Sequence, residues 1–263
     1  TKAMPGVPQV LVFDTAFHQT MPPQAYTYAL PYEMCKEYSI RRFGAHGTSH
    51  RFVSGEMCKI LGRTEGTKIV TCHIGNGSSI SAVKDGKCID TSMGMTPLAG
   101  VMMGTRCGDI DPAVVTYVMK KTGMSPDEMS DFMNKKCGFI GVSGISSDSR
   151  DIEAAILKGD DRAYLTATTL AYQVKKDIGS YAAAMNGLDA VVFTAGMGEN
   201  NPELRERACA DMDYLGIKLD NEVNAKAHHQ SDIVELSAKD SKVKVYLIPT
   251  NEELMIASDT ERL

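Results

Sequence analysis

The chain has 263 residues, of which 43% are hydrophobic and 23% charged, a balance that excludes a miniprotein scaffold, a collagen-like repeat and a disordered chain. Its 28 Lys and Arg are outnumbered by 33 Asp and Glu, so it lacks the basic excess that binds a nucleic-acid backbone. No apolar run approaches the ~20 residues that span a bilayer, and seven scattered cysteines without a C-x-x-C pair are typical of a reducing compartment. We expect a cytoplasmic globular protein that binds neither nucleic acid nor a membrane.

The first expected element is a strand at residues 10–13, whose β-branched and aromatic side chains lead to Asp14. A helix is expected from Thr48 or Ser49 to Leu61, because a hydroxyl group can cap its first turn and a glycine follows its end.

Residues 67–73 predict a second strand, which runs directly into the glycine turn Gly75-Asn76-Gly77. Residues 78–84 and 87–91 have the clearest hairpin pattern, because Asp85-Gly86 between them favours the positive φ angles of a type I′ turn. Strand, glycine turn and hairpin are therefore expected to be contiguous.

The remaining elements are marked by capping residues, prolines and glycine stops. Helices are expected at 112–121, from 126, at 151–157 and at 160–185. Two further strands, 189–194 and 243–248, are each followed by a polar or glycine-rich segment and a helix, which begins at Pro202 or Glu252.

Strands that alternate with helices, with one inserted hairpin, predict an α/β fold with a mixed β-sheet flanked by helices. Ligands in such folds bind at the carboxyl ends of strands. Four segments carry polar or glycine residues at such ends: Asp14, His73 to Gly77, Gly196 to Asn200, and Asn251-Glu252.

The two glycine turns can bring backbone N–H groups close to an anion and so hold two portions of one phosphorylated ligand. Each is equally well explained as a tight turn. The Walker A motif is absent, and Gly196-x-Gly198 lacks the third glycine of a dinucleotide fingerprint because Asn201 stands in its place. A nucleotide is the favoured ligand, and an NAD-dependent oxidoreductase is a weaker alternative.

Two histidines flank a glycine just before a predicted helix N-terminus, which favours anions. We expect His46, on the loop, to be catalytic and His50, in the first helical turn, to be structural. Arg106 lies between glycines and can reach an equatorial phosphoryl oxygen, although a loop arginine is more often an exposed charge or an ion-pair partner.

Other polar residues have two interpretations. Asp148 reads first as a helix cap, and Glu252 is either a Mg²⁺ ligand or a favourable charge at a helix start. The pair His228-His229 is expected to be exposed and not a metal site, and the Met-rich segment 93–103 to be packing.

Six segments occur in the order seen in acetate kinases, and the chain resembles that family from about residue 8 to its C-terminus. They are VFDTAFHQTMP, which contains Asp14, and then FGAHGTSH, CHIGNGSS, MGTRCGDIDP, AGMGEN and IPTNEE. The resemblance implies the acetate and sugar kinase/Hsp70/actin superfold, with an actin-like ATPase/ribonuclease H-like domain. It implies reversible, Mg²⁺-dependent transfer of the γ-phosphoryl group of ATP to acetate, which yields acetyl phosphate and ADP, and a homodimer formed through the C-terminal domain.

By the same resemblance, Asp14, His46, His73 and Arg106 are catalytic, and Glu252 is the Mg²⁺ ligand. The implied mechanism is direct in-line transfer, in which Arg106 and His46 would stabilise the transferring phosphoryl group. The nucleotide would be held by His73, Ile74, Gly75, Asn76, Gly77, Asp148, Ser149, Arg150, Gly196, Met197, Gly198, Glu199 and Asn200. For Asp148 this role outweighs the interpretation as a cap.

The resemblance leaves the acyl group open. Pro97 matches part of the apolar pocket for the acyl methyl group, and Ala45 stands where some members carry Phe. A propionate or other short-chain acyl kinase is therefore the close alternative.

The resemblance also implies a missing segment, since acetate kinases open with a strand and an Asn-Ala-Gly-Ser-Ser-type loop that this chain lacks. We expect the opening third to be absent, with its phosphate loop, an Asn that shares Mg²⁺ and an Arg that binds the carboxylate. Residues 1–17 would be a remnant of the N-terminal domain, 18–251 the C-terminal nucleotide-binding and dimerisation domain, and 252–263 a helix that returns to the first domain. A catalytically incomplete, nucleotide-binding fragment is the further alternative.

Overall fold

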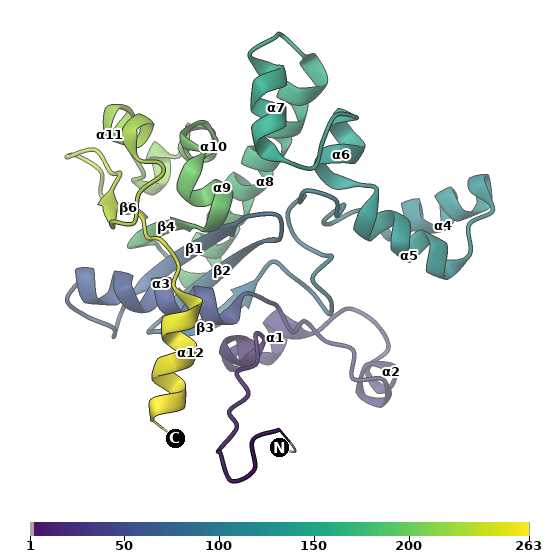
Figure 1. Ribbon diagram of the computed structural model, residues 1–263, viewed down its shortest axis with the longest axis horizontal. Helices are drawn as coiled ribbons and strands as arrows, with labels where there is room; N and C mark the ends of the chain where they lie inside the picture. The colour runs from purple at the N-terminus through teal and green to yellow at the C-terminus, as the bar shows by residue number, and fades with distance from the viewer. Residues whose placement is uncertain (1–2, 263) are drawn as a thin grey trace.

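A six-stranded mixed sheet organises the protein, and the computed structural model describes it over residues 3–262 (Figure 1). The strand order is β3-β2-β1-β4-β6-β5, with β1, β4 and β6 parallel and the other three antiparallel to their neighbours. The strands are β1 (Lys68–Ile74), β2 (Ser78–Lys84), β3 (Lys87–Thr91), β4 (Ala190–Thr194), β5 (Val234–Glu235) and β6 (Lys244–Leu247). The predicted α/β class with a mixed sheet is confirmed.

The predicted hairpin is also confirmed. Strands β2 and β3 close at Lys84 and Lys87, and Asp85 and Gly86 between them have φ angles of 53° and 72°. Two consecutive positive φ angles are what a type I′ turn requires, because its twist matches that of the flanking strands.

Two helices cover the opposite faces of the sheet (Figure 1). The long helix α8 (Asp161–Met185) packs Leu170, Val174 and Ile178 against one face. Helix α3 (Gly47–Ile60) packs Val53 and Met57 against the other. Because side chains alternate along a strand, β1 sends one set of residues into each layer.

The other predicted helices form close to their expected bounds, and the capping box of Ser125 and Glu128 is present. Helices α6 and α11, the 3₁₀ turns, strand β5 and the one-turn helix α1 were not predicted. The remaining helical elements are η1 (Ala16–Thr20), α1 (Pro23–Tyr26), α2 (Tyr32–Glu37), α4 (Pro112–Thr122), α5 (Pro126–Lys135), α6 (Gly138–Ser143), α7 (Ser149–Ile156), α9 (Ala195–Asn200), α10 (Pro202–Cys209), η2 (Asp213–Leu215), α11 (Asn221–Lys226) and α12 (Glu252–Glu261). Within the described part of the chain, no helix is both long and apolar enough to cross a membrane.

The predicted strand at residues 10–13 is wrong. These residues join no ladder of the described chain, and the side chains of Leu11 and Phe13 are 78% and 66% exposed. Apolar and β-branched composition favours extended backbone, but a strand also needs a neighbour to accept and donate its backbone hydrogen bonds.

The predicted N-cap residue of α3 is wrong. Neither Thr48 nor Ser49 caps the helix, because the N-cap is His46 in the left-handed region, with a φ of 59°. The capping acceptors come from Asp14, 32 residues earlier, whose side chain bonds the His46 N–H. A cap that is remote in sequence leaves no local signal.

The predicted glycine turn after β4 is a short helix. Ala195, with a φ of 64°, turns the chain directly from β4 into α9, which holds Gly196 to Asn200. The Glu199 carboxylate accepts a hydrogen bond from the Ala195 N–H at 2.8 Å and closes this first turn.

The hairpin turn can be tested with Gly86→Ala. A side chain in the left-handed region costs roughly 1–2 kcal/mol, and a Cβ there would lie 2.9 Å from the Thr64 methyl carbon, so we expect the free energy of unfolding to fall by at least that amount in chemical denaturation. The matched control is Gly55→Ala, because Gly55 lies inside α3 with nothing within 4 Å of a new Cβ. It should gain ~0.5–1 kcal/mol from helix propensity. Equal stability of the two variants would contradict the turn.

Candidate active site

A cavity of 600 Å³ opens where β1 and β4 end. Its walls come from five stretches that are far apart in the sequence: the N-cap of α3, the end of β1 with the β1–β2 turn, the start of α7, α9 with the residue after it, and the loop after α11. The lining residues are His46, His73, Gly75, Asn76, Gly77, Asp148, Ser149, Arg150, Glu153, Ala195, Gly196, Met197, Asn200, Asn201 and His229. The position agrees with the rule that parallel strands present ligands at their carboxyl ends.

The Gly75-Asn76-Gly77 turn is tight and closely approached. The Gly75 N–H donates to the Gly77 carbonyl at 3.1 Å. A Cβ on Gly77 would lie 3.1 Å from His46 Nε2 and 3.5 Å from Arg106 Nη1. A side chain at this position would therefore crowd His46, and the two side chains above Gly77 both reach the same point.

Asp14 is fixed at the start of α3. Its Oδ2 accepts a hydrogen bond from the His46 N–H at 2.6 Å, and its carbonyl accepts one from the Gly47 N–H at 2.8 Å. A Cβ on Gly47 would lie 2.3 Å from that carbonyl oxygen, so this approach also needs a glycine. The predicted catalytic residues Asp14 and His46 are thus in direct contact.

His46 and His73 stack on one another, with ring centroids 4.1 Å apart and planes 18° apart. Burial, together with the nearby His46, lowers the pKa of His73 to about 3. Burial also lowers the pKa of His46, against the opposing effect of Asp14 and with a smaller lowering by Arg106. Both rings are therefore neutral at neutral pH.

Arg106 lies beside Gly77 but does not line the cavity, and its own loop holds it in place. Its Nη1 donates to the Pro97 carbonyl at 3.1 Å and lies 3.5 Å from the Met103 sulfur. It forms no ion pair with a carboxylate among residues 3–262, so its charge is available to an anion. The interpretation of Arg106 as an ion-pair partner is therefore wrong among the described residues.

Both interpretations of Asp148 are compatible with the structure. Its Oδ1 accepts the Arg150 N–H at 2.9 Å and so caps α7. Its carboxylate also pairs with the Arg150 guanidinium, which lowers the pKa of Asp148 to about 2. The same two residues line the cavity.

Three residues of the predicted nucleotide site do not line the cavity. Ile74 is fully buried in the core. Gly198 packs against β1, since a Cβ added to it would lie 3.4 Å from the Cys72 carbonyl oxygen. Glu199 turns its carboxylate to the Ala195 and Thr250 N–H groups, at 2.8 and 3.2 Å, and so ties the ends of β4 and β6 together.

The predicted acyl-pocket residues lie beside the catalytic candidates but outside the cavity. Ala45 is buried in a small cluster with Met93 and Met103. Met103 in turn contacts Arg106, and Arg106 contacts Pro97. This apolar group is therefore next to the guanidinium.

Glu252, the predicted metal ligand, stands at the start of α12. Burial raises the pKa of its carboxyl group, and the neighbouring Asp14 carboxylate raises it further. No cluster of three or more potential ligand side chains exists in the described chain. Mg²⁺ usually binds one or two protein carboxylates and keeps waters or substrate phosphates, so this acidic environment fits it without a preformed protein cage.

Sequence reasoning missed four lining residues, Glu153, Ala195, Asn201 and His229. His229 was predicted to be exposed, which is confirmed, but its N–H also donates to Asn200 Oδ1 at 2.8 Å. No local pattern marks such a residue, because α11 and its loop are brought to α9 only by tertiary packing.

The buried Arg205 explains that packing. Its side chain is fully buried and donates to the carbonyls of Gly198 and Glu199 at 2.8 and 3.0 Å and to that of Ala227 at 2.6 Å. It thereby joins the end of α9 to the segment that leads to His229.

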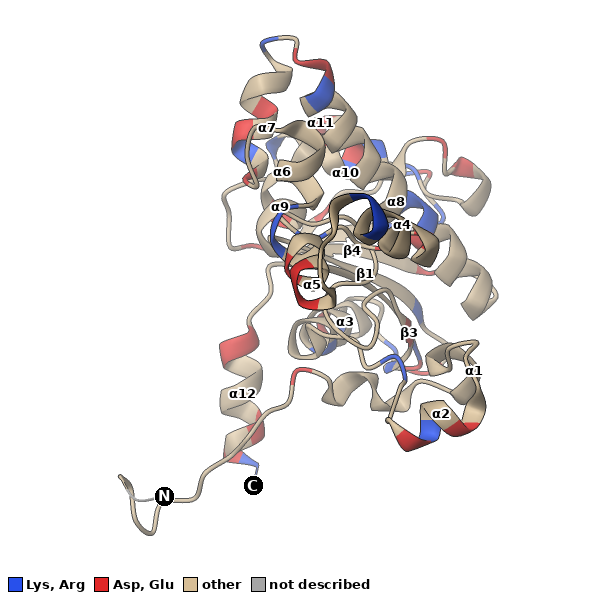
Figure 2. Ribbon diagram, turned by 90° about the vertical axis from the view of Figure 1, so that its right-hand side faces the viewer, with Lys and Arg blue, Asp and Glu red and all other residues tan. Residues whose placement is uncertain are grey.

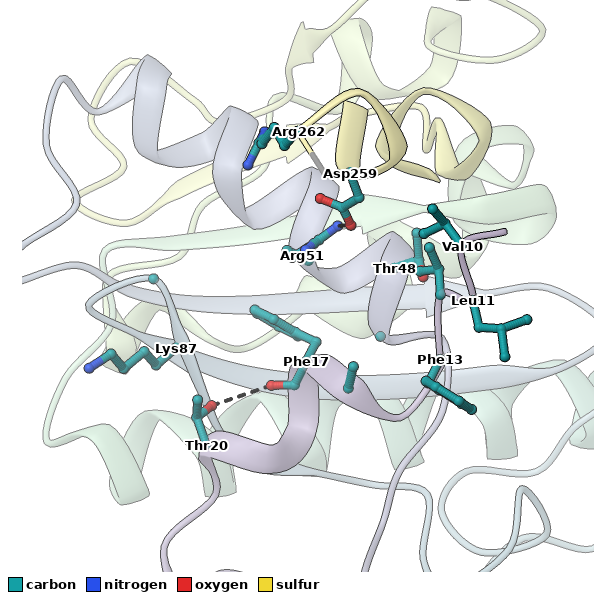
Figure 3. Close-up of a pocket in the computed structure, with 14 residues that line it drawn as sticks. Val10, Leu11, Phe13, Phe17, Thr20, Thr48, Arg51, Lys87, Asp259 and Arg262 are labelled. Atoms are coloured by element: carbon teal, nitrogen blue, oxygen red, sulfur yellow. Dashed lines mark hydrogen bonds and ion pairs between the residues drawn. The ribbon is translucent and has the colours of Figure 1, made fainter. Parts of the chain in front are cut away.

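A second cavity, of 580 Å³, shares no residue with the first. Figure 3 shows Val10, Leu11 and Phe13 on one side of it, with Arg51 of α3 paired to Asp259 of α12 on the other. None of the predicted site residues lines this cavity.

The chain matches the model of the acetokinase family over residues 1–258. An acetate kinase of Bacteroides thetaiotaomicron is 58% identical over 258 residues, which cover 98% of this chain and 64% of the relative. An acetate kinase of Thermotoga maritima is 57% identical over 264 residues, which cover 100% and 65%. The chain thus spans about 64% of the length of the curated relatives it matches.

Two solved structures are close to this fold. The crystal structure of Porphyromonas gingivalis acetate kinase has a TM-score of 0.96 and 52% identity, and covers 99% of this chain and 65% of its own. A propionate kinase from Francisella tularensis has a TM-score of 0.93 and 43% identity, and covers 100% and 66%.

The neutral state of His73 predicts a pH dependence of stability. The unfolded chain protonates this ring near its ordinary pKa of 6.5, and the folded chain only near 3. Between these values the unfolded state binds more protons, so stability falls as the pH falls, by at most ~1.4 kcal/mol per pH unit from this group.

His73→Asn removes this contribution. We expect its free energy of unfolding to vary less steeply with pH in that window, measured by urea denaturation at a series of pH values. A slope as steep as in the unmodified chain would show that folded His73 already carries a proton.

Proposed function

This chain belongs to the acetokinase family, and on that premise we propose that the full-length protein containing it is an acetate kinase. It would transfer the γ-phosphoryl group of ATP to acetate, with Mg²⁺, and release acetyl phosphate and ADP. The observation that carries the proposal is that four predicted catalytic residues are neighbours in the fold. His46 and His73 stack and line the cavity, Asp14 bonds the His46 N–H, and Arg106 reaches the same glycine as His46.

In this proposal the cavity holds the nucleotide. The Gly75-to-Gly77 turn and the first turn of α9 would face its phosphates with backbone N–H groups, and the Asp148-to-Arg150 segment would contact the nucleoside. Ile74, Gly198 and Glu199 would act through the backbone, because they lie behind the lining.

The transfer would be a direct in-line displacement. The acetate oxygen forms the new bond to phosphorus as the bond to the leaving ADP oxygen breaks. Arg106 would neutralise the charge on the equatorial oxygens, and His46 and His73 would lie beside it. Asp14 would orient the reacting groups from the α3 N-terminus. Glu252 would hold Mg²⁺, which when bound neutralises phosphate charge.

The candidate acyl pocket is the buried cluster of Ala45, Met93 and Met103 beside Arg106, and acetate is the first candidate because the curated relatives are acetate kinases. The likeness to a propionate kinase keeps the longer acyl group as the second candidate. One methylene is worth only ~1–3 kcal/mol in an apolar pocket, so the two substrates must be compared directly.

We also propose that the opening third of the full-length protein precedes this chain, as a domain completed by residues 1–17 and 252–263. Residues 18–251 would then be the nucleotide-binding and dimerisation domain. Helix α12 stands apart from the sheet, near the N-terminal segment (Figure 2). It contacts α3 but has no buried residue, and Leu254 and Ile256 are half exposed. The exposed Leu11 and Phe13 lie across the second cavity from it.

This arrangement predicts a difference between the isolated chain and the full-length protein. The isolated chain would bind nucleotide without transferring phosphate, and its α12 amides would exchange quickly with solvent. In the full-length protein we expect slower hydrogen exchange in α12. Equal exchange in both would contradict a covering domain.

The activity is tested by incubating the full-length protein with ATP, Mg²⁺ and either acetate or propionate, and trapping the acyl phosphate with hydroxylamine. We expect product from both, with the higher kcat/KM for acetate. A higher kcat/KM for propionate would favour the second candidate, and no acyl phosphate from either would overturn both.

The role of Arg106 is tested by Arg106→Ala. An arginine that neutralises the transferring group contributes roughly 10³-fold or more to kcat, so we expect a loss of that size with a much smaller change in ATP affinity. Arg63→Ala is the control, because Arg63 pairs with Asp189 and lines neither of these two cavities. An unchanged kcat in Arg106→Ala would remove Arg106 from the mechanism.

A further inference from the structure

Behind the two stacked imidazoles lies a layer of buried hydroxyl groups. Strand β1 turns Thr71 and His73 toward α3, and β2 presents their cross-strand partners Ser81 and Ser79 on the same face. All of these side chains are buried. Each hydroxyl has one proton to donate, so the order of donors and acceptors through the layer is constrained.

The first chain of contacts runs from Thr71 to His46. Thr71 Oγ1 lies 2.7 Å from His50 Nδ1, His50 Nε2 lies 2.7 Å from Ser79 Oγ, and Ser79 Oγ lies 2.8 Å from His46 Nδ1. Thr71 donates its own proton to the Ser81 carbonyl at 3.4 Å.

When Thr71 donates to that carbonyl, it accepts from His50 Nδ1. His50 Nε2 then carries the lone pair and accepts from Ser79, and Ser79 accepts from His46 Nδ1. The opposite order would lose the bond to Ser81. It would also turn an N–H of His46 toward the Arg106 guanidinium, which lies near the same point above Gly77.

The second chain of contacts ends at His73. Thr250 Oγ1 donates to Ser49 Oγ at 2.8 Å, and Ser49 Oγ lies 2.8 Å from His73 Nδ1. Ser49 is fully buried, so its own proton needs an acceptor. The lone pair of His73 Nδ1 is the acceptor within reach, which leaves the ring proton on Nε2.

We propose that these two hydroxyl relays fix opposite tautomers on the stacked rings: Ser79 holds the proton of neutral His46 on Nδ1, and Ser49 holds that of His73 on Nε2. Ser49 and Ser79 are then positioning residues. His73 presents a permanent N–H donor at the cavity, while neutral His46 presents a lone pair.

The role of these tautomers in catalysis rests on the proposed function. A phosphoryl oxygen accepts hydrogen bonds, so His73 can bind one as a neutral ring, whereas His46 can donate to one only after it gains a proton. Burial, which lowers the pKa of both rings, makes the distinction matter at neutral pH. Two rings of one residue type would thus have different tasks in one site.

The test is the tautomer itself, read from long-range ¹H–¹⁵N correlation spectra of the histidine rings in the full-length protein at neutral pH. We expect the unprotonated nitrogen to be Nε2 in His46 and Nδ1 in His73. An unprotonated Nδ1 in His46, or an unprotonated Nε2 in His73, would overturn the assignment.

The variants separate positioning from structure. Ser79→Ala should change His46 from one tautomer to a mixture and leave His73 as it is, and Ser49→Ala should do the converse. Ser79→Thr should restore the single tautomer of His46. The matched control is Ser81→Ala, a buried serine two residues along β2 whose hydroxyl bonds Thr91 and no histidine.

These results are independent of the proposed activity, because no substrate is added. If the tautomers are as assigned but no acyl phosphate forms, the proposed function fails and the relays stand. If acyl phosphate forms while Ser79→Ala leaves the His46 spectrum unchanged, the relay fails and the function stands.

Discussion

The contact between Asp14 and the first residues of α3 determines the geometry of the candidate site. Two N–H groups at the start of this helix have no helical partner, and Asp14 satisfies both, one with its carboxylate and one with its carbonyl. The turn that allows this places His46 in the left-handed region and above Gly77. It also sends the next helical turn, with Ser49 and His50, into the buried layer beneath.

The site divides its polar groups by burial. The imidazoles and hydroxyls of the floor are buried, paired with one another and neutral, because an unpaired charge there would cost too much. The charged groups lie around this floor, with the Asp148–Arg150 pair lining the cavity and Arg106 beside Gly77. Such an arrangement offers oriented donors to an anion with little reorganisation, as electrostatic stabilisation of a transferring group requires.

The structural elements behind the site are tied together by a few buried polar side chains. Arg205 joins α9 to the loop after α11, and Glu199 joins the ends of β4 and β6. Both act on backbone groups, so they hold segments rather than ligands. Within residues 3–262, Leu11 and Phe13 beside the second cavity remain exposed. They lie on the side where the proposed first domain would pack.

The sequence by itself determined the local elements, because their causes are local. The Asp85-Gly86 turn, the Ser125 capping box and the glycine stop after Met185 each act within a few residues, and all were predicted and are present. The motif order identified the family, and it pointed to His46, His73 and Arg106 without showing that they meet.

Only the tertiary structure decided which atoms those side chains offer and what closes the helix beneath them. Residues 10–13 have strand composition but no strand, because pairing depends on a neighbour and not on propensity. The cap of α3 comes from 32 residues away, and the partners of His46 and His73 come from another strand, another helix and the loop before α12. Hydrogen bonds between distant segments leave no periodic pattern in a sequence, so their direction can be established only in the folded chain.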